Sequence, residues 1–242
     1  MRHRTLLGIL TPSSNTALEP LTSAIVSGLP GVSAHFARFT VTEISLRDQA
    51  LGQFDDSKIL EAAKLLADAR VDSFGWSGTS SGWLGFDRDE QLCRRITEAT
   101  GVPATTSVLA LNEALEKRGA RDFALVTPYL GSVQEAIVAN YRRSGFNVTA
   151  ERHLDLQVNF SFAEVTEEEI ARLVREVAQT RPKAITTFCT NLRAAHLVPR
   201  LEEETGIPIY DTVSTVIWKQ LRMAGVDARK VRGWGRLFQQ LP

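Results

Sequence analysis

The sequence FGWSGTS occupies residues 74–80, and the similar sequence ITTFCTN occupies residues 185–191. Each stretch runs from apolar residues into small residues with hydroxyl, thiol or amide groups, and Gly78 corresponds to Cys189. Two further pairs follow the same order along the chain: LTPS at 10–13 pairs with VTPY at 126–129, and TGVP at 100–103 pairs with TGIP at 205–208. Three pairs in one order indicate that the chain is built from two similar halves.

Short apolar runs alternate with longer amphipathic segments in both halves. We expect strands at Leu6–Leu10, Val32–Phe39, Val71–Trp76, Phe123–Val126, Asn147–His153 and Ala184–Phe188. We expect helices at Asp56–Ala69, Arg88–Thr100, Ser107–Arg118, Ser132–Arg143, Thr166–Gln179 and Ala194–Glu204, with another opening near Thr212. Strands that alternate with helices of this length form parallel sheets covered by helices on both faces. The predicted fold is therefore α/β, with two pseudo-symmetric Rossmann-like (flavodoxin-like) domains.

The two domains are expected at residues 1–110 and 111–222, and the C-terminal segment 223–242 is expected to pack back on the first domain. In open parallel sheets, ligands bind beyond the carboxyl ends of the strands. The repeated segments come directly after predicted strands, so their polar residues should meet in a cleft between the domains. We expect the active site in that cleft.

The composition excludes several classes of function. The chain has 242 residues, of which 28 are Lys or Arg and 28 are Asp or Glu, so no net charge attracts nucleic acid or an anionic membrane. The apolar run Leu6–Leu10 is too short for a secretion signal, and no run approaches the roughly 20 apolar residues that span a bilayer. Two cysteines indicate neither a disulfide framework nor a metal site. We expect a soluble, cytoplasmic protein that uses no metal.

Each Thr-Pro turn leads from a strand towards a helix and exposes backbone amides. Together with the hydroxyl groups of Ser13, Ser14 and Tyr129 and the carboxamide of Asn15, these amides can hold an anion at a helix N-terminus. Ser14 or Asn15 could instead serve as an ordinary helix cap. Because the turns recur in both halves, we favour binding of a substrate carboxylate.

The second pair of turns supplies small polar residues directly after apolar strands: Gly78, Thr79 and Ser80 in one half, and Cys189, Thr190 and Asn191 in the other. Donors placed around a carboxylate stabilise the enediolate that forms when charge flows into it from Cα. A thiol at such a strand end can exchange a proton with that Cα. We therefore predict that Cys189 is catalytic, against the alternative of a buried core cysteine.

The unequal pair Gly78 and Cys189 limits this chemistry. Two thiols on opposite faces of a substrate would permit proton removal on one side and delivery on the other, as in a racemase. A single thiol serves one face, so the carbanion arises most simply by loss of CO2. In that role the thiol must stay protonated, and an apolar environment helps by raising its pKa.

Two smaller questions stay open from the residues alone. His196 follows Cys189 closely and could activate it as in a Cys-His hydrolase, if the two are in contact and a third group orients the histidine. Trp76, Trp83 and Phe86 flank the Gly78 turn and form either the wall of an apolar pocket or part of the core.

The motifs resemble those of the aspartate/glutamate racemase superfamily, specifically its branch of arylmalonate decarboxylases and maleate cis-trans isomerases. The resemblance runs nearly end to end and includes GILTPSSN at 8–15, GTS at 78–80, TPY at 127–129, Cys189 and GWGRLF at 233–238. It implies an enzyme without metal or cofactor, with its site between two pseudo-symmetric domains.

Site roles follow from the resemblance by position. It implies that Gly78 replaces the first cysteine of the racemases and that Cys189 protonates an enediolate. It further implies that a dioxyanion hole forms from Thr79, Ser80 and Tyr129 with backbone amides near Ser80 and Thr190, and that Pro12 lies by an apolar pocket for the departing carboxylate.

Two positions, Ser13 and Thr190, differ from the decarboxylases. Those enzymes have a second proline at Ser13 and a glycine at Thr190, whereas Asn15 and Asn191 resemble asparagines that bind a substrate carboxylate in the isomerases and racemases. The isomerases, however, carry cysteine at the position of Gly78. The sequence combines features of both groups.

We therefore predict a cofactor-independent decarboxylase of a malonate-like dicarboxylate, in which the single cysteine protonates the enediolate. The alternatives are a maleate-type cis-trans isomerase, an Asp/Glu-type racemase, or a carboxylate-binding protein without activity. The expected partner is a small dicarboxylate substrate, with neither nucleic acid nor membrane, and a homo-oligomer is compatible with the sequence.

Overall fold

The computed structural model describes residues 4–44, 46 and 56–241. The first sheet contains β1 (Thr5–Pro12), β2 (Val32–Phe39), β3 (Ser73–Trp76) and β4 (Ala104–Thr106) in the order β2-β1-β3-β4. The second contains β5 (Asp122–Val126), β6 (Asn147–Arg152), β7 (Ala184–Thr187) and β8 (Ile209–Asp211) in the order β6-β5-β7-β8. All neighbouring strands are parallel. The identical strand order confirms the predicted α/β fold of two similar halves.

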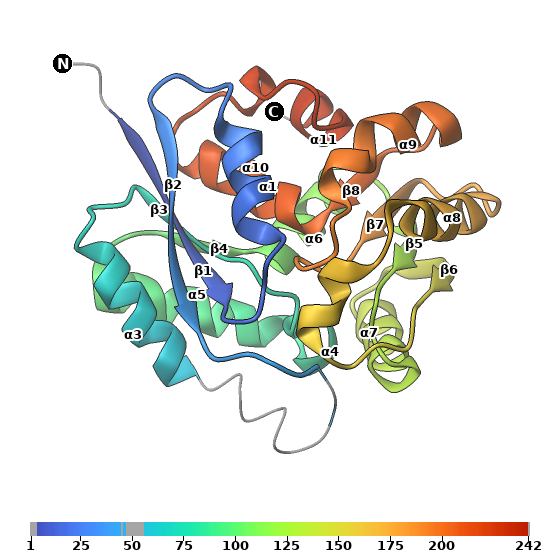
Figure 1. Ribbon diagram of the computed structural model, residues 1–242, viewed down its shortest axis with the longest axis horizontal. Coiled ribbons are helices and arrows are strands. Elements are labelled where there is room, and N and C mark those ends of the chain that lie inside the picture. Colours follow the sequence, from blue (N-terminus) through green and yellow to red (C-terminus); the bar gives the residue numbers. More distant parts are fainter. Residues whose placement is uncertain (1–3, 45, 47–55, 242) are drawn as a thin grey trace.

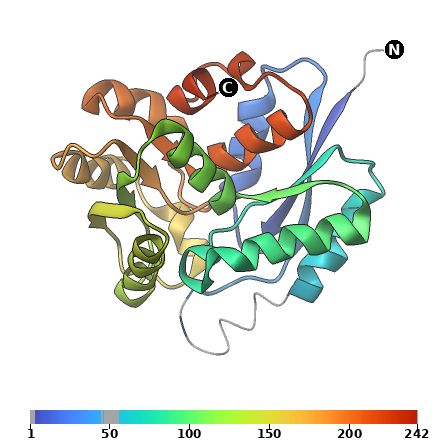
Figure 2. The same cartoon turned by 180° about the vertical axis from the view of Figure 1, so that it is seen from behind.

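Helices cover both faces of each sheet (Figures 1 and 2). In the first half, α3 (Asp56–Ala67) lies beside α5 (Phe86–Thr100), while α1 (Leu18–Val26) lies beside α10 (Thr212–Met223). In the second half, α7 (Gly131–Arg143) packs against β6 and the short α4 (Ser81–Leu84), and α8 (Glu167–Ala178) packs against β5 and α9 (Val198–Thr205). The remaining elements are α6 (Ser107–Arg118), α11 (Arg236–Gln240) and the 3-10 turns η2 (Asn159–Glu164), η3 (Ala195–Leu197) and η4 (Ala228–Lys230).

The repeated Thr-Gly-x-Pro sequence has the same local structure in both halves. Gly101 and Gly206 end α5 and α9 with φ of 73°, a left-handed conformation that glycine adopts without a steric penalty. The carbonyl two residues later, at position 103 or 208, accepts a 2.9 Å hydrogen bond from the amide of the second residue of β3 or of β7, Phe74 or Ile185. The motif therefore stops a helix and begins the neighbouring strand.

Helix α8 illustrates how the sequence determines a packed helix. Thr166 accepts a hydrogen bond from the Glu169 amide and caps the N-terminus. Apolar residues at helical spacing, Ile170, Leu173, Val174 and Val177, are buried towards the second sheet.

Three expectations about elements need correction. The helix expected at Ala194–Glu204 consists of η3 followed by α9, because Pro199 lies in the first turn of α9 and provides no N–H for a continuous helix. The three-residue strands β4 and β8 were not predicted, since such short runs carry no periodicity. A helix was expected after the first Thr-Pro turn, but the bounds of α1 were not predicted.

Two C-terminal elements connect the halves. Helix α10 follows β8 in the chain but packs against β3 and β4 of the first sheet. Residues 225–227 and Lys230 line a hollow with residues 29–32 of the first half, whereas α11 contacts α10 and β8. The expected domain boundary near residue 110 stays a prediction.

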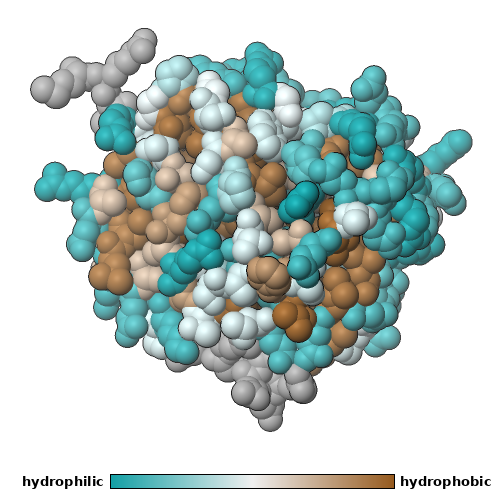
Figure 3. All heavy atoms as spheres, in the orientation of Figure 1, coloured by the Kyte–Doolittle hydropathy of each residue, from teal (hydrophilic) through white to brown (hydrophobic). Residues whose placement is uncertain are grey.

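The surface in the orientation of Figure 1 mixes hydrophilic residues with smaller hydrophobic groups (Figure 3). Large apolar side chains that stay exposed include Leu46, Leu65, Val158 and Phe160. Among the described residues, no helix has the length and apolar character required to cross a membrane.

Candidate functional site

A small cavity lies beyond the carboxyl ends of β1, β3, β5 and β7, with lining residues from both halves. Its volume is about 20 Å³, which is room for about one water molecule. The lining residues are Pro12, Val41, Ile44, Trp76, Gly78, Thr79, Ser80, Trp83, Tyr129, Asn159, Cys189 and Thr190. The repeated segments thus meet where the parallel-sheet argument places a ligand.

Equivalent backbone contacts position the Gly78 and Cys189 turns. The amide of Ser77 donates to the Leu10 carbonyl at 3.0 Å, and the amide of Phe188 donates to the Val126 carbonyl at 2.8 Å. Each turn is therefore fixed against the end of the adjacent strand. Cys189 is only 2% exposed and faces the cavity from the end of β7.

Burial raises the pKa of the Cys189 thiol to about 11. The hydrogen bond with the Tyr129 hydroxyl and the backbone N–H groups of Asn191 and Leu192 lower this pKa, but desolvation is the largest effect. The negative charge of Asp211 raises it further. The thiol is therefore protonated at neutral pH, and it can donate a proton.

Tyr129 connects the thiol to the first half of the molecule. Its hydroxyl oxygen lies 2.6 Å from Oγ1 of Thr79, and it also forms a hydrogen bond with Cys189. The tyrosine ring contacts Trp83 and Phe162 edge-on, with centroids 5.4 and 5.5 Å away. Burial raises the pKa of Tyr129 well above its usual value, so the hydroxyl keeps its proton and can donate to an anion.

The turn that presents Tyr129 is held from several sides. Oγ1 of Thr127 donates to Oε1 of Gln134 at 2.7 Å and accepts from the Tyr129 amide at 3.3 Å. The carbonyls of Pro128 and Tyr129 accept from the amides of residues 156 and 155 at 2.9 and 3.2 Å. The backbone of this turn is therefore rigid, which suits a residue whose hydroxyl group must keep a fixed direction.

One part of the cavity wall is apolar and another part carries hydroxyl groups. Pro12, Val41, Ile44, Trp76 and Trp83 form the apolar part. Trp76 and Trp83 are also 1% and 7% exposed, so both of the interpretations left open for them apply: they are buried and they line the pocket. Phe86, in contrast, packs on Tyr141 outside the lining.

Four of the predicted binding residues lie outside the lining and contact other protein groups. Oδ1 of Asn15 accepts from the amides of Ala17 and Leu18 at 3.0 and 2.9 Å, so it caps the start of α1. Oδ1 of Asn191 accepts from the amides of Thr16 and Ala17 at 2.9 and 3.2 Å. An asparagine of the second half therefore holds the segment that leads into α1 of the first half.

The two serines of the first Thr-Pro turn bond to the segment after β2. Oγ of Ser14 donates to the Val41 carbonyl and accepts from Nδ2 of Asn159 at 2.7 Å. Oγ of Ser13 accepts from the Val41 amide at 3.2 Å. The binding roles of Ser13, Ser14, Asn15 and Asn191 stay predictions.

A clasp, made of segments 41–44 and 157–159, closes the cavity between the two halves. Two backbone hydrogen bonds of 3.0 Å run between the segments, and Glu43 lies opposite Val158 in an antiparallel bridge. The clasp contributes Val41, Ile44 and Asn159 to the lining. Sequence reasoning missed these three residues, because neither segment has a periodic pattern or belongs to the repeat.

The histidine considered as a partner of Cys189 has another contact. Nε2 of His196 lies 2.9 Å from Oε1 of Glu167, and the imidazole is one-third exposed. Within the described residues, no group of His, Cys, Asp and Glu side chains is arranged to hold a metal ion.

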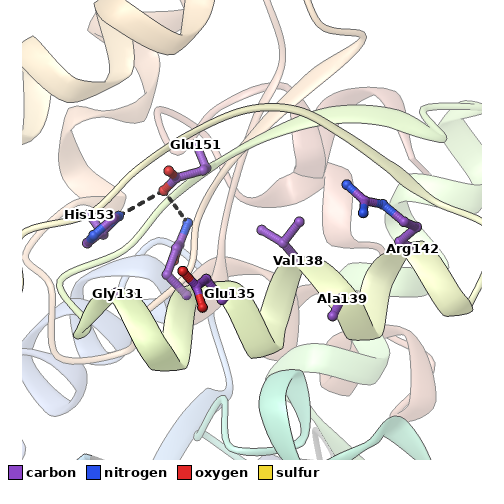
Figure 4. A pocket seen from close by; sticks show the side chains of 8 residues that line it. Gly131, Glu135, Val138, Ala139, Arg142, Glu151 and His153 are labelled. Atoms are coloured by element: carbon purple, nitrogen blue, oxygen red, sulfur yellow. Dashed lines mark hydrogen bonds and ion pairs between the residues drawn. The ribbon is translucent and has the colours of Figure 1, made fainter.

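A larger hollow of about 430 Å³ lies elsewhere, between α7 and the end of β6 (Figure 4). Glu151 accepts hydrogen bonds there from Gln134 and His153, both at 2.9 Å. We assign the candidate site to the smaller cavity, because it alone of the two contains the repeated strand-end residues and the protonated thiol.

Comparison with known proteins gives one family and two activities. A family model described as arylmalonate decarboxylase matches residues 14–238. The arylmalonate decarboxylase of Bordetella bronchiseptica is 29% identical over 166 residues, which are 67% of this chain and 69% of that protein. The maleate isomerase of Nocardia farcinica is 26% identical over 247 residues, covering 97% of this chain and 95% of that protein.

Solved structures repeat this division. A crystal structure of a Pseudomonas putida maleate isomerase with maleate superposes with a TM-score of 0.90 at 22% identity, covering 98% of both chains. A liganded mutant of arylmalonate decarboxylase superposes with a TM-score of 0.85 at 22% identity, covering 98% of this chain and 99% of that chain. At such identities the likeness establishes a shared fold.

Proposed function

Because the chain belongs to the arylmalonate decarboxylase family, we propose that it is a cofactor-independent decarboxylase of a malonate-like dicarboxylate. The supporting observation is the division of the cavity around Cys189. A protonated thiol faces hydroxyl groups on one part of the wall and apolar side chains on another. A carboxylate that stays on the substrate matches the hydroxyl groups, and one that leaves as neutral CO2 matches the apolar part.

The retained carboxylate would bind to the hydroxyl groups of Thr79, Ser80 and Tyr129. These side chains come from the strand ends of both halves, so a bound substrate contacts both halves. Hydrogen-bond donors fixed in a site without bulk water stabilise developing negative charge strongly, because they do not have to reorient during the reaction.

The second carboxylate would lie against Pro12, Val41 and Trp76. An apolar wall disfavours a charged carboxylate but not neutral CO2, so it favours breaking the bond between Cα and that carboxyl carbon. The electron pair of this bond passes into the retained carboxylate and gives an enediolate.

Cys189 would then donate its proton to Cα of the enediolate. The resulting thiolate keeps the Tyr129 hydrogen bond and the backbone N–H groups of Asn191 and Leu192, and water returns the proton. Per turnover, one dicarboxylate and one proton give one CO2 and one monocarboxylate. Since the thiol lies on one side of the cavity, the proton reaches one face of Cα.

A panel of substituted malonates tests this proposal by measured CO2 release and chiral analysis of the product. We expect Cys189→Ala to lower kcat about 100- to 10,000-fold, the range for loss of a general acid. Cys93→Ala is the matched control, since Cys93 lies in α5 outside the cavity lining and should retain full activity. An unchanged rate for Cys189→Ala would contradict the assigned role.

Maleate-type isomerisation is the second candidate, because maleate isomerases are among the relatives over nearly the whole chain. One isomerase structure is described with a covalently bound succinylcysteine intermediate. Here such a step would require the Cys189 thiolate to add to a double bond, and burial disfavours that thiolate. Conversion of maleate to fumarate, with no CO2 from any malonate, would establish the isomerase and refute the decarboxylase.

A further inference from the structure

The side-chain volume of position 78 is filled by a tryptophan. A Cβ atom built on Gly78 would lie 1.9 Å from Cζ2 of Trp76 and 2.4 Å from its Cε2 and Cη2 atoms. Real Cβ atoms essentially never approach another heavy atom closer than 3.0 Å. Any side chain at position 78 therefore requires the indole to move.

The indole itself is held in place. Trp76 is 1% exposed, and its ring packs on Phe39 with a centroid distance of 4.9 Å. Its backbone is paired on both sides within the first sheet, with Leu10 and with Thr106. Close packing of this kind gives a buried ring little room to shift.

The corresponding residues of the second half have the opposite arrangement. Thr187 corresponds to Trp76 in the repeat, and its hydroxyl donates to Oδ2 of Asp211 at 2.7 Å, while Cys189 faces the cavity. One half thus combines a large residue with glycine, and the other combines a small residue with cysteine.

We propose that Trp76 is the specificity-determining residue that makes this site one-sided. Its indole occupies the volume that a second acid-base side chain at position 78 would need, and it covers the face of Cα opposite Cys189. Replacing Gly78 is then insufficient to create a two-sided site, because Trp76 must become smaller as well. This inference rests on the proposed decarboxylation for its stereochemical part, but its steric part does not depend on the reaction.

The steric part is tested by a double-mutant cycle on melting temperature. We expect Gly78→Ala to lower Tm by about 5 °C in the native background, as for overpacking of a domain of this size. In the Trp76→Leu background the same substitution should lower Tm by less than half as much. Trp83→Leu is the control, since Trp83 also lines the cavity but supplies none of the three atoms nearest to the Cβ built on Gly78. Additive Tm changes in the Trp76 cycle would overturn the inference.

The stereochemical part uses methyl(phenyl)malonate as the probe and the enantiomer ratio of the 2-phenylpropanoate product as the readout. We expect the native protein and Gly78→Cys to give one enantiomer in excess, and Gly78→Cys combined with Trp76→Leu to give both. Both enantiomers from Gly78→Cys alone would overturn the inference.

These experiments distinguish failure of the proposed decarboxylase function from failure of the proposed role of Trp76. If no variant releases CO2 but the Tm cycle is coupled, the decarboxylase assignment fails and the steric role of Trp76 stands. If CO2 is released and the cycle is additive, the enzyme assignment stands and the role of Trp76 fails.

Discussion

The hydroxyl oxygens of Thr79 and Tyr129 lie 2.6 Å apart, although the two residues belong to different halves of the molecule. Tyr129 also bonds to the Cys189 thiol, so one tyrosine links the proposed carboxylate site to the proposed proton donor. Thr79 and Tyr129, 50 positions apart in the chain, meet at this point because each follows a strand of a parallel sheet.

Tyr129→Phe should lower kcat for malonate decarboxylation by about 100- to 1,000-fold, because it removes one fixed donor from the developing enediolate. The measurement is steady-state CO2 release, with urea unfolding to verify the fold. Tyr141→Phe is the matched control: Tyr141 is equally buried, its hydroxyl has no hydrogen-bond partner among the residues that the structure describes, and it does not line the cavity. Equal rate losses in the two variants would contradict a specific role for Tyr129.

Alkylation of the Cys189 thiol should report a pKa near 11. Because only the thiolate reacts, the rate of iodoacetamide modification should rise about tenfold per pH unit from neutral pH towards that value. The measurement is intact-protein mass spectrometry in a Cys93→Ala background, where Cys189 is the one remaining thiol. A rate that is already maximal at pH 8 would indicate a nucleophilic thiolate and favour the isomerase.

The fold could be predicted because its signals are local. Thr-Gly-x-Pro stops a helix through a left-handed glycine and begins a strand, and the pattern is similar wherever it occurs. Three repeated signals of this kind were sufficient to predict two similar parallel sheets. Helix α10 shows the limit, because its packing against β3 and β4 of the other half depends on tertiary contacts that no local pattern encodes.

The candidate site could be predicted only in part, for the same reason. Cys189, Thr79 and Tyr129 are recognisable because each follows a strand. Asn159 reaches the cavity through the clasp, and its segment has no strand or repeat to mark it. Sequence also could not decide between capping and ligand binding for Asn15, because both roles use the same carboxamide.

Asn15→Ala should lower the free energy of unfolding by about 1 kcal/mol through loss of the α1 cap, whereas Asn15→Ser should retain part of this contribution, because serine also caps helices and introduces no charge at this buried position. Urea unfolding of both variants measures this. Malonate KM then separates the roles: removal of the carboxamide raises KM only if this residue also faces the substrate. An Asn15→Ser variant as unstable as Asn15→Ala would contradict the capping role.

Asp211 should make stability depend on pH in an unusual direction. Burial raises its pKa from 3.8 to about 6, so between these values the folded state binds more protons than the unfolded state. The contribution of Asp211 to the free energy of unfolding is complete below pH 3.8. About 3 kcal/mol of it is lost as the pH rises through 6.

Asp211→Asn tests this, because the amide oxygen can still accept from the amides of Val213 and Ser214 while the charge is gone. The native protein should exceed the variant in unfolding free energy by more at pH 4 than at pH 7. A difference that is the same at both pH values in urea titrations would exclude a titrating Asp211.

We expect the clasp to open during turnover, because a cavity of about 20 Å³ holds about one water molecule and a dicarboxylate is larger. Glu43 and Val158 form a non-hydrogen-bonded antiparallel pair, whose Cα atoms lie about 4.5 Å apart, within disulfide range. The test variant combines Glu43→Cys and Val158→Cys in a Cys93→Ala background. It should lose at least about 90% of its activity when the disulfide forms and regain it when a reductant is added. The reason is that a covalent bridge costs far more to break than backbone hydrogen bonds of about 1 kcal/mol each. Val158→Cys alone is the control. Full activity of the oxidised double variant, with the disulfide verified by mass spectrometry, would show that substrate enters without opening the clasp.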